Sequence, residues 1–241
     1  MKGYNETNAN VKRAREKPPI RGVVPISEPM TLATDYALGT LCASCALLLL
    51  RRSDTRSQIS VRLWAFAFFA VAVASYAGGT YHGFQYTMTG PWRTALWKMT
   101  TLSMGVASFL LLSAAFASTW TGRHRRWLLA AAALKFVIFA GWMVRQDDFR
   151  FVIYDYSSTL AILMLLVMSG WTRGIDKHRA YIGCGIVVSI AAAAVQQSGL
   201  RLHRHFNHND LMHVVQMGGM WLLYKGGARL RDAGGIDDRQ P

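Results

Sequence analysis

Several polar side chains that could carry out chemistry lie together at the start of the last apolar run of the chain. Residues 203–216 read His-Arg-His-Phe-Asn-His-Asn-Asp-Leu-Met-His-Val-Val-Gln. On a helix, Asn209, His213 and Gln216 follow one another at spacings of four and three residues, so they share one face. Asp210 lies three residues before His213, close enough for its carboxylate to orient the imidazole ring.

Three imidazoles could bind one metal ion if this run meets another apolar run that also carries a histidine. The predicted metal ligands are His82, near the end of the second apolar run, and His208 and His213 in the last one. Hydrolytic zinc sites commonly use three protein ligands and a water, and the zinc lowers the pKa of that water to about 7. A nearby carboxylate would then act as general base or acid, and a hydroxyl would orient the substrate carbonyl. The candidates for these roles are Asp210, Asp155 and Ser75.

The same residues also have purely structural readings, and the sequence leaves both open. His82 follows two glycines, and small residues of this kind let helix backbones approach closely. Asp210 and His213 could form a structural pair. Lys135, near the middle of the fourth apolar run, could extend toward the membrane surface or pair with Asp155.

Seven apolar runs must position these side chains. They cover residues 33–50, 61–84, 95–118, 127–144, 150–171, 180–199 and 210–226. Each run is long enough as a helix to cross a hydrocarbon core of about 30 Å at about 1.5 Å per residue. Most of the eight tryptophans flank these runs, as in the aromatic belts of membrane proteins. The sequence therefore predicts an all-α, polytopic membrane protein with a seven-transmembrane-helix bundle.

Alternating crossings place most of the candidate residues on one side of the membrane. Five of the seven histidines share that side, namely His82, His203, His205, His208 and His213. Basic residues are denser in the loops of the other side, near 51–62, 123–126 and 173–179 and after 225, although the N-terminal tail is basic too. The positive-inside rule, applied to the loops, predicts the N-terminus outside and the C-terminus in the cytoplasm. The many Ala and Arg residues and the short loops are typical of a bacterial plasma (inner) membrane.

The composition argues against a nucleic-acid-binding protein and against a metal site made of cysteines. The net charge is +14, but the basic residues punctuate apolar runs, which favours anionic lipid over nucleic acid as the partner. The three cysteines lie within apolar runs and form no metal-binding pattern. The first apolar run begins too late for a cleavable signal peptide.

We expect a disordered polar tail over 1–30, a transmembrane domain over 31–227 and a flexible cytoplasmic tail over 228–241.

The seven-run topology, with a histidine late in the second run and a histidine pattern early in the seventh, resembles a known group of membrane hydrolases. This is the CREST superfamily, which includes alkaline ceramidases and the adiponectin/progestin receptor family. His82 matches the histidine of the family's second helix, and His213 matches the second histidine of the His-x-x-x-His in its seventh helix. The resemblance implies a zinc-dependent amidase that acts on lipid-like molecules.

The chain departs from the pattern of that family at several positions. Asn209 stands at the first position of the seventh-helix motif, with His208 beside it, and Gly78 stands where the family has a serine. The family's aspartate early in the third helix has no counterpart, and Thr100 or Thr101 occupies that depth. A carboxylate from another helix would have to replace it, and the candidates are Asp210, Asp155 and Asp35.

Three functions compete on this reading. The first is a zinc-dependent hydrolase of lipid-like amides or esters, with its site near the outer face and a substrate that enters laterally from the outer leaflet. The second is a non-enzymatic membrane sensor, transporter or structural subunit with a polar pocket open to the outside. The third, a haem or quinone redox protein, is less favoured because it needs histidine pairs facing each other across the bundle, whereas these histidines crowd one end.

Overall fold

Seven α-helices make up most of the chain that the computed structural model describes, which is residues 26–52, 57–171, 177–200, 202–203 and 206–234. The helices are α2 (Pro29–Arg51), α3 (Ile59–Phe84), α4 (Gly90–Thr119), α5 (Gly122–Arg145), α6 (Arg150–Trp171), α7 (Lys177–Ser198) and α8 (His208–Gly227). No strand occurs in these residues, so the predicted all-α class is confirmed. Most of the tail predicted to be disordered, residues 1–25, lies outside the described part.

Local sequence signals explain where several helices begin. Pro29 and Pro91 stand in the first turns of α2 and α4, where a missing N–H group and a fixed φ suit the helix. Gly122 has a φ of +59° at the sharp turn between α4 and α5. The side chain of Asn207 accepts hydrogen bonds at the start of α8, and Asp210 completes a capping box there.

Six of these helices are long and apolar enough to cross a membrane, by length and composition. They are α2 to α7, and they make the chain a multi-pass helical membrane protein. α8 is similar in length but less apolar, because it carries two histidines, an aspartate and a lysine.

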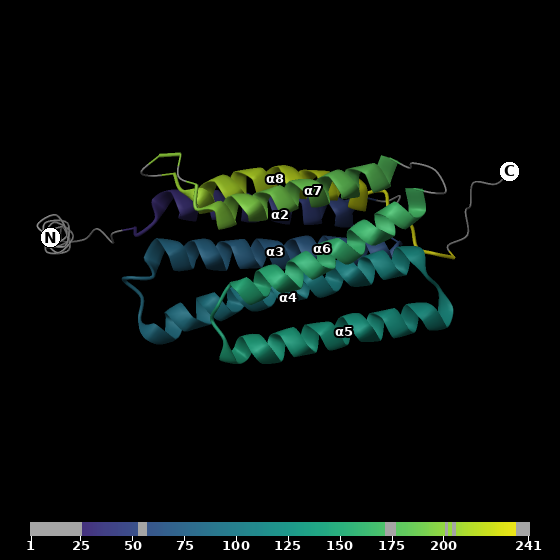
Figure 1. Ribbon diagram of the computed structural model, residues 1–241, viewed down its shortest axis with the longest axis horizontal. Helices are drawn as coiled ribbons and strands as arrows, with labels where there is room; N and C mark the ends of the chain where they lie inside the picture. The colour runs from purple at the N-terminus through teal and green to yellow at the C-terminus, as the bar shows by residue number, and fades with distance from the viewer. Residues whose placement is uncertain (1–25, 53–56, 172–176, 201, 204–205, 235–241) are drawn as a thin grey trace, which may run out of the picture.

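The helices run roughly along one common direction, with neighbours in the chain alternating in sense (Figure 1). α2 packs against α3 and α8, and α7 packs against α8. α4 packs against α3, α5 and α6. α5 lies at one edge of the bundle, and its outer face exposes apolar side chains such as Val137 and Ile138. The first and last described helices are therefore neighbours inside the bundle, while α5 is peripheral.

Small residues let α7 and α8 approach closely. A Cβ atom added at Gly219 would lie 3.3 Å from the carbonyl oxygen of Gly185, and one at Gly226 would lie 3.1 Å from the carbonyl oxygen of His178. Such closeness is typical of packing between membrane helices, where association depends on van der Waals contact. This contact fixes the position of α8, which carries most of the polar residues singled out in the sequence.

The residues after α8 turn back onto the bundle. Ala228 and Leu230 are buried, and the backbone N–H of Ala233 donates to the carbonyl oxygen of Ala117 at 3.0 Å. The carboxylate of Asp232 accepts from the backbone N–H groups of Ile59 and Ser60, at 2.7 and 2.8 Å. These residues fall within the segment predicted to be a flexible tail, and here they pack against α3 and α4.

Candidate functional site

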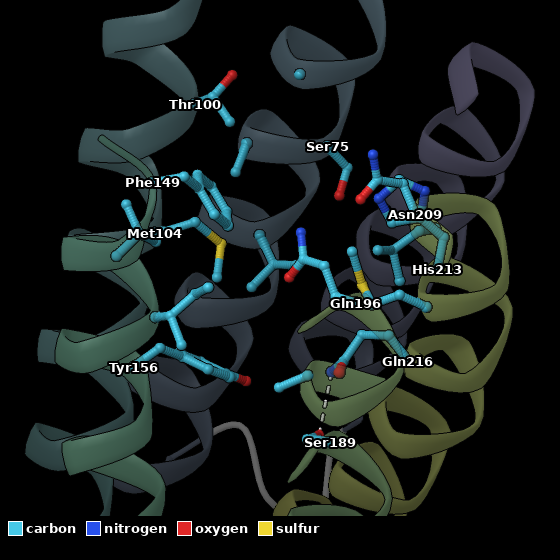
Figure 2. A pocket seen from close by; sticks show the side chains of 18 of the residues that line it. Ser75, Thr100, Met104, Phe149, Tyr156, Ser189, Gln196, Asn209, His213 and Gln216 are labelled. Atoms are coloured by element: carbon cyan, nitrogen blue, oxygen red, sulfur yellow. Dashed lines mark hydrogen bonds between the residues drawn. The ribbon is translucent and has the colours of Figure 1, made fainter. Parts of the chain in front are cut away.

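A cavity of about 340 Å³ lies between α2, α3, α4, α6, α7 and α8, near the end where α8 begins. Figure 2 shows that Asn209, His213 and Gln216 line it from α8, while Met104 and Phe149 face them across the space. Further polar side chains in its wall are Asp35, Ser75, His82, Thr100, Tyr156, Ser189 and Gln196. Further apolar side chains are Leu38, Val71, Val152, Leu160 and Met220. The cavity is therefore amphipathic, as is typical of a ligand site.

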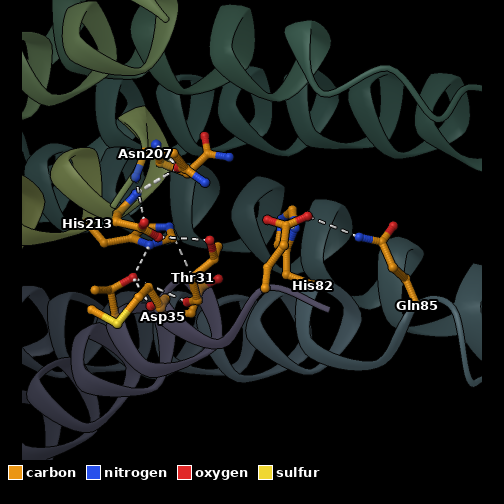
Figure 3. A network of polar contacts seen from close by, with 11 residues as sticks. Thr31, Asp35, His82, Gln85, Asn207 and His213 are labelled. Atoms are coloured by element: carbon orange, nitrogen blue, oxygen red, sulfur yellow. Dashed lines mark hydrogen bonds and ion pairs between the residues drawn. The ribbon is translucent and has the colours of Figure 1, made fainter. Parts of the chain in front are cut away.

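His213 is held by polar partners at both ring nitrogens (Figure 3). Its Nε2 lies 3.1 Å from Oδ1 of Asp35, and its Nδ1 lies 3.0 Å from the hydroxyl of Thr34. His213 and Asp35 are 7% and 6% exposed, so this contact lies inside the protein. A carboxylate beside one nitrogen and a hydroxyl beside the other fix the orientation of the ring. The imidazole ring of His213 is therefore held in one orientation toward α2.

Asp210 does not pair with His213 but caps its own helix and contacts α2. Its Oδ2 accepts from the backbone N–H of Asn207 at 2.8 Å, and its Oδ1 accepts from the hydroxyl of Thr31 at 2.8 Å. The side chain at this position of a capping box reaches back toward the start of the helix, which turns it away from the residue three positions later. Asp35, from another helix, takes the place beside His213 that the spacing predicted for Asp210.

His82 lines the same cavity but belongs to a separate polar group (Figure 3). Its Nδ1 is 3.4 Å from Oε2 of Glu28, within ion-pair distance but without the geometry of a hydrogen bond. Gln85 donates to the other oxygen of Glu28 at 3.2 Å. The neighbouring imidazole lowers the pKa of the Glu28 carboxyl below its usual value. The ring of Trp97 lies edge-to-face to His82, with 6.5 Å between the ring centroids.

The remaining predicted site residues divide between the cavity and other places. Ser75 is buried and lines the cavity. Asp155 instead faces α5, where Lys135 forms an ion pair with it, as the sequence suggested for a lysine in the middle of a span. Lys135 also donates to the hydroxyl of Thr159 at 3.2 Å. His208, the first residue of α8, is not among the residues that line the cavity, and its Nδ1 is buried without a hydrogen-bond partner.

The described structure does not group the three histidines predicted as zinc ligands. A ligand imidazole must direct a nitrogen lone pair at the metal, and both nitrogens of His213 already face Asp35 and Thr34. Within the described residues, no group of three His, Cys, Asp or Glu side chains is placed to hold a metal ion. Zinc binding therefore stays a prediction that calls for a direct measurement.

Sequence reasoning named Asp35 as a candidate carboxylate but missed the other polar residues where the first helix begins. Thr31, Thr34 and Asp35 lie on one face of α2 and meet α8, and Glu28 meets His82. The spacing of three and four residues among these polar side chains, in an otherwise apolar run, was the available signal. Their partners could not be read from it, because those partners lie on other helices.

The fold and the cavity define a class of protein: a multi-pass helical membrane protein with an internal amphipathic site. The chain belongs to a family of unknown function, DUF6962, whose sequence profile matches residues 30–232. The match includes the whole wall of the cavity, while Glu28 lies just before it. A comparison with curated proteins and one with solved structures each gave no match.

Proposed function

We propose that the protein is a seven-span membrane receptor or carrier that binds a lipid-like amphiphile in its cavity without chemical conversion. The observation that carries this proposal is the cavity itself, which places apolar side chains opposite amide, hydroxyl and carboxylate groups inside an apolar bundle. The amides of Asn209 and Gln216 and the hydroxyl of Ser75 can hydrogen-bond to an amide, ester or hydroxyl group. The apolar wall on α4 and α6 can accept a hydrocarbon chain.

The polar helix α8 serves as the seventh span in this proposal. Its least apolar residues face inward, since Asp210 is 0% exposed and His213 is 7% exposed. Ionisable side chains within membranes face the bundle interior and pair there, which is what Asp210 and His213 do with α2. A low overall hydropathy is therefore compatible with a membrane-spanning position for this helix.

The ligand enters from the membrane between α6 and α7. Ser157 of α6 and Ile190 of α7 both line the cavity, and both are exposed. Ile190 is 53% exposed, so its side chain lies at an apolar surface that lipid would cover. Because the basic loops lie at the opposite end of the bundle, the positive-inside rule puts this opening in the outer leaflet of the plasma membrane, with the N-terminus outside.

Filling the cavity tests this proposal. Ala193 of α7 lines the cavity, whereas its neighbour Ala194 is exposed and does not. We expect Ala193→Trp to abolish co-purification of an amphiphile, because the indole ring would occupy the space that the ligand needs. The measurement is mass spectrometry of lipids extracted from protein purified in mild detergent.

Ala194→Trp is the matched control, since it adds the same ring on the same helix and should retain the amphiphile. Equal amounts of bound amphiphile in the two variants, both folded by size-exclusion chromatography, would count against the cavity as the binding site. A wild-type protein that carries no amphiphile and takes none up from added lipid would contradict the function altogether.

The second candidate is a zinc-dependent hydrolase of lipid-like amides or esters, as the resemblance to the CREST superfamily implies. Its supporting observation is that His82, His213 and Ser75 all line one cavity although they come from two different helices. The engaged ring of His213 is what ranks it below the first proposal.

Elemental analysis separates the two candidates. For a non-catalytic receptor or carrier, we expect protein purified without chelators to contain far less than one zinc per chain, and His82→Ala and His213→Ala to leave that value unchanged. About one zinc per chain, lost in both variants while the fold persists, would instead establish the metal site and favour the hydrolase.

A further inference from the structure

A second cavity lies at the opposite end of the bundle from the amphipathic site. It has a volume of about 270 Å³ and is walled by the end of α4, the second half of α6, the start of α7 and the residues after α8. Its basic side chains are Arg179, Arg229, Arg231 and His178. None of the described residues that line it is acidic, so the wall carries a concentrated positive charge.

Two of these arginines are held in place yet keep most of their donors for a ligand. Arg229 donates to the carbonyl oxygen of Lys225 at 2.7 Å, and its guanidinium lies 5.1 Å from the ring centroid of Tyr181. Arg179 makes one long hydrogen bond, 3.4 Å, to the carbonyl oxygen of Leu166. A guanidinium has five N–H donors, so among the described partners each arginine uses only one of them in a hydrogen bond.

Among the described residues, the acidic side chain that directly follows Arg231 is turned toward other partners. Both carboxylate oxygens of Asp232 accept from backbone N–H groups at the start of α3, at 2.7 and 2.8 Å. Asp232 is thus oriented toward Ile59 and Ser60, and it is not among the residues that line the cavity. The described residues that line the cavity therefore carry a net positive charge.

The rest of the wall suits a hydrocarbon chain. Leu163, Leu166 and Val167 of α6 and Ile182 of α7 line the cavity beside the arginines. Cationic side chains next to apolar ones, at the ends of membrane helices, match the depth of a phospholipid headgroup and the first part of its acyl chains. Clustered arginines favour phosphate oxygens because planar guanidinium groups can bind them with paired hydrogen bonds.

We infer that this basic cavity is a binding site for a phosphate group, with Arg179 and Arg229 as its main ligand-binding residues. The site is separate from the amphipathic cavity and would exist whether or not that cavity binds a ligand. The phosphate can belong to an anionic phospholipid of the adjacent leaflet or to a small soluble molecule, and both sources present the same oxygens to the arginines.

Native mass spectrometry of the full chain in detergent tests the site. The probes are phosphatidylglycerol and diacylglycerol with identical acyl chains, which differ in the phosphate-bearing headgroup. We expect phosphatidylglycerol to bind at least about tenfold more tightly, because its phosphate oxygens can accept charge-assisted hydrogen bonds from the arginines. The double variant Arg179→Gln/Arg229→Gln should lose that preference. Arg126→Gln, which removes an exposed charge at the same end without touching the cavity, should keep it.

Added inorganic phosphate identifies the source. Displacement of phosphatidylglycerol by millimolar phosphate would show a site for a free phosphate compound, and resistance to displacement would show a lipid site. Equal binding of the two lipids to the wild-type protein would overturn the inference without relying on any variant. An equal loss in Arg126→Gln and the double variant would also overturn it, because the effect would then come from net charge alone.

Discussion

Replacing Lys135 with methionine is expected to lower the free energy of unfolding by about 3–5 kcal/mol, the largest effect of any single substitution considered for this protein. Lys135 of α5 forms an ion pair with Asp155 of α6 and donates to the carbonyl oxygen of the same residue at 3.0 Å. The side chain of Asp155 is 7% exposed, so removal of the lysine leaves a buried carboxylate without its cation. Thermal and denaturant-induced unfolding in detergent, followed by tryptophan fluorescence, measures the loss.

The double variant Lys135→Met/Asp155→Leu is the matched control. It removes both charges together, and replacing a buried ion pair by apolar side chains of similar volume is often neutral or stabilising. We therefore expect the double variant to be more stable than Lys135→Met alone. A double variant whose two effects simply add would mean that the two side chains are not coupled, and the ion pair would then not explain how the peripheral helix α5 is anchored.

The second large effect is expected from Gly226→Val, which should destabilise the protein by at least about 2–3 kcal/mol. Gly226 is buried where α8 crosses the start of α7, and an added Cβ would overlap the side chain of Ile182. It would also lie 3.1 Å from the backbone nitrogen of Ile182 and 3.1 Å from the carbonyl oxygen of His178. Backbone atoms cannot move aside as a flexible side chain can, so the two helices must separate.

Gly218→Val provides the comparison within the same helix. Gly218 is exposed, and the nearest atom to an added Cβ is Cγ1 of Val188 at 4.0 Å. The same change of side chain should therefore leave the melting temperature close to that of the wild type. If both glycine variants melted at the same reduced temperature, the cause would be the helix propensity of valine and not the packing of α7 on α8.

The helices could be predicted from the sequence because their signal is local. The seven apolar runs correspond one to one with α2 to α8, although α4 begins at Gly90 and not at the predicted residue 95. An apolar run marks the part of a helix inside the hydrocarbon, whereas backbone hydrogen bonding continues into the interface, where Gly90, Pro91 and Trp92 form the first turn of the helix. The ion pair of Lys135 and Asp155 could also be predicted from the sequence, because a lysine in the middle of a membrane span requires a partner.

The pairing of the site residues could not be predicted, because it depends on which helices meet. Spacing along α8 favoured Asp210 as the partner of His213, but the contact with α2 brings Asp35 there. Asp210 instead completes the capping box at the start of α8. Its side chain therefore points back toward Asn207 and away from His213. The sequence did place His82 and His213 at the same end of the bundle, and both line one cavity.

The contact between α2 and α8 has a consequence for how the chain is assembled during synthesis. α2 is synthesised long before α8, so Asp35, Thr31 and Thr34 have none of their α8 partners until the five helices between them, α3 to α7, have been made. A ribosome adds about 5–20 residues per second, so this polar face waits for many seconds. During that interval the growing chain presents a carboxylate and two hydroxyls that α8 later covers. The contact between α2 and α8 can therefore form only after α8 has been made.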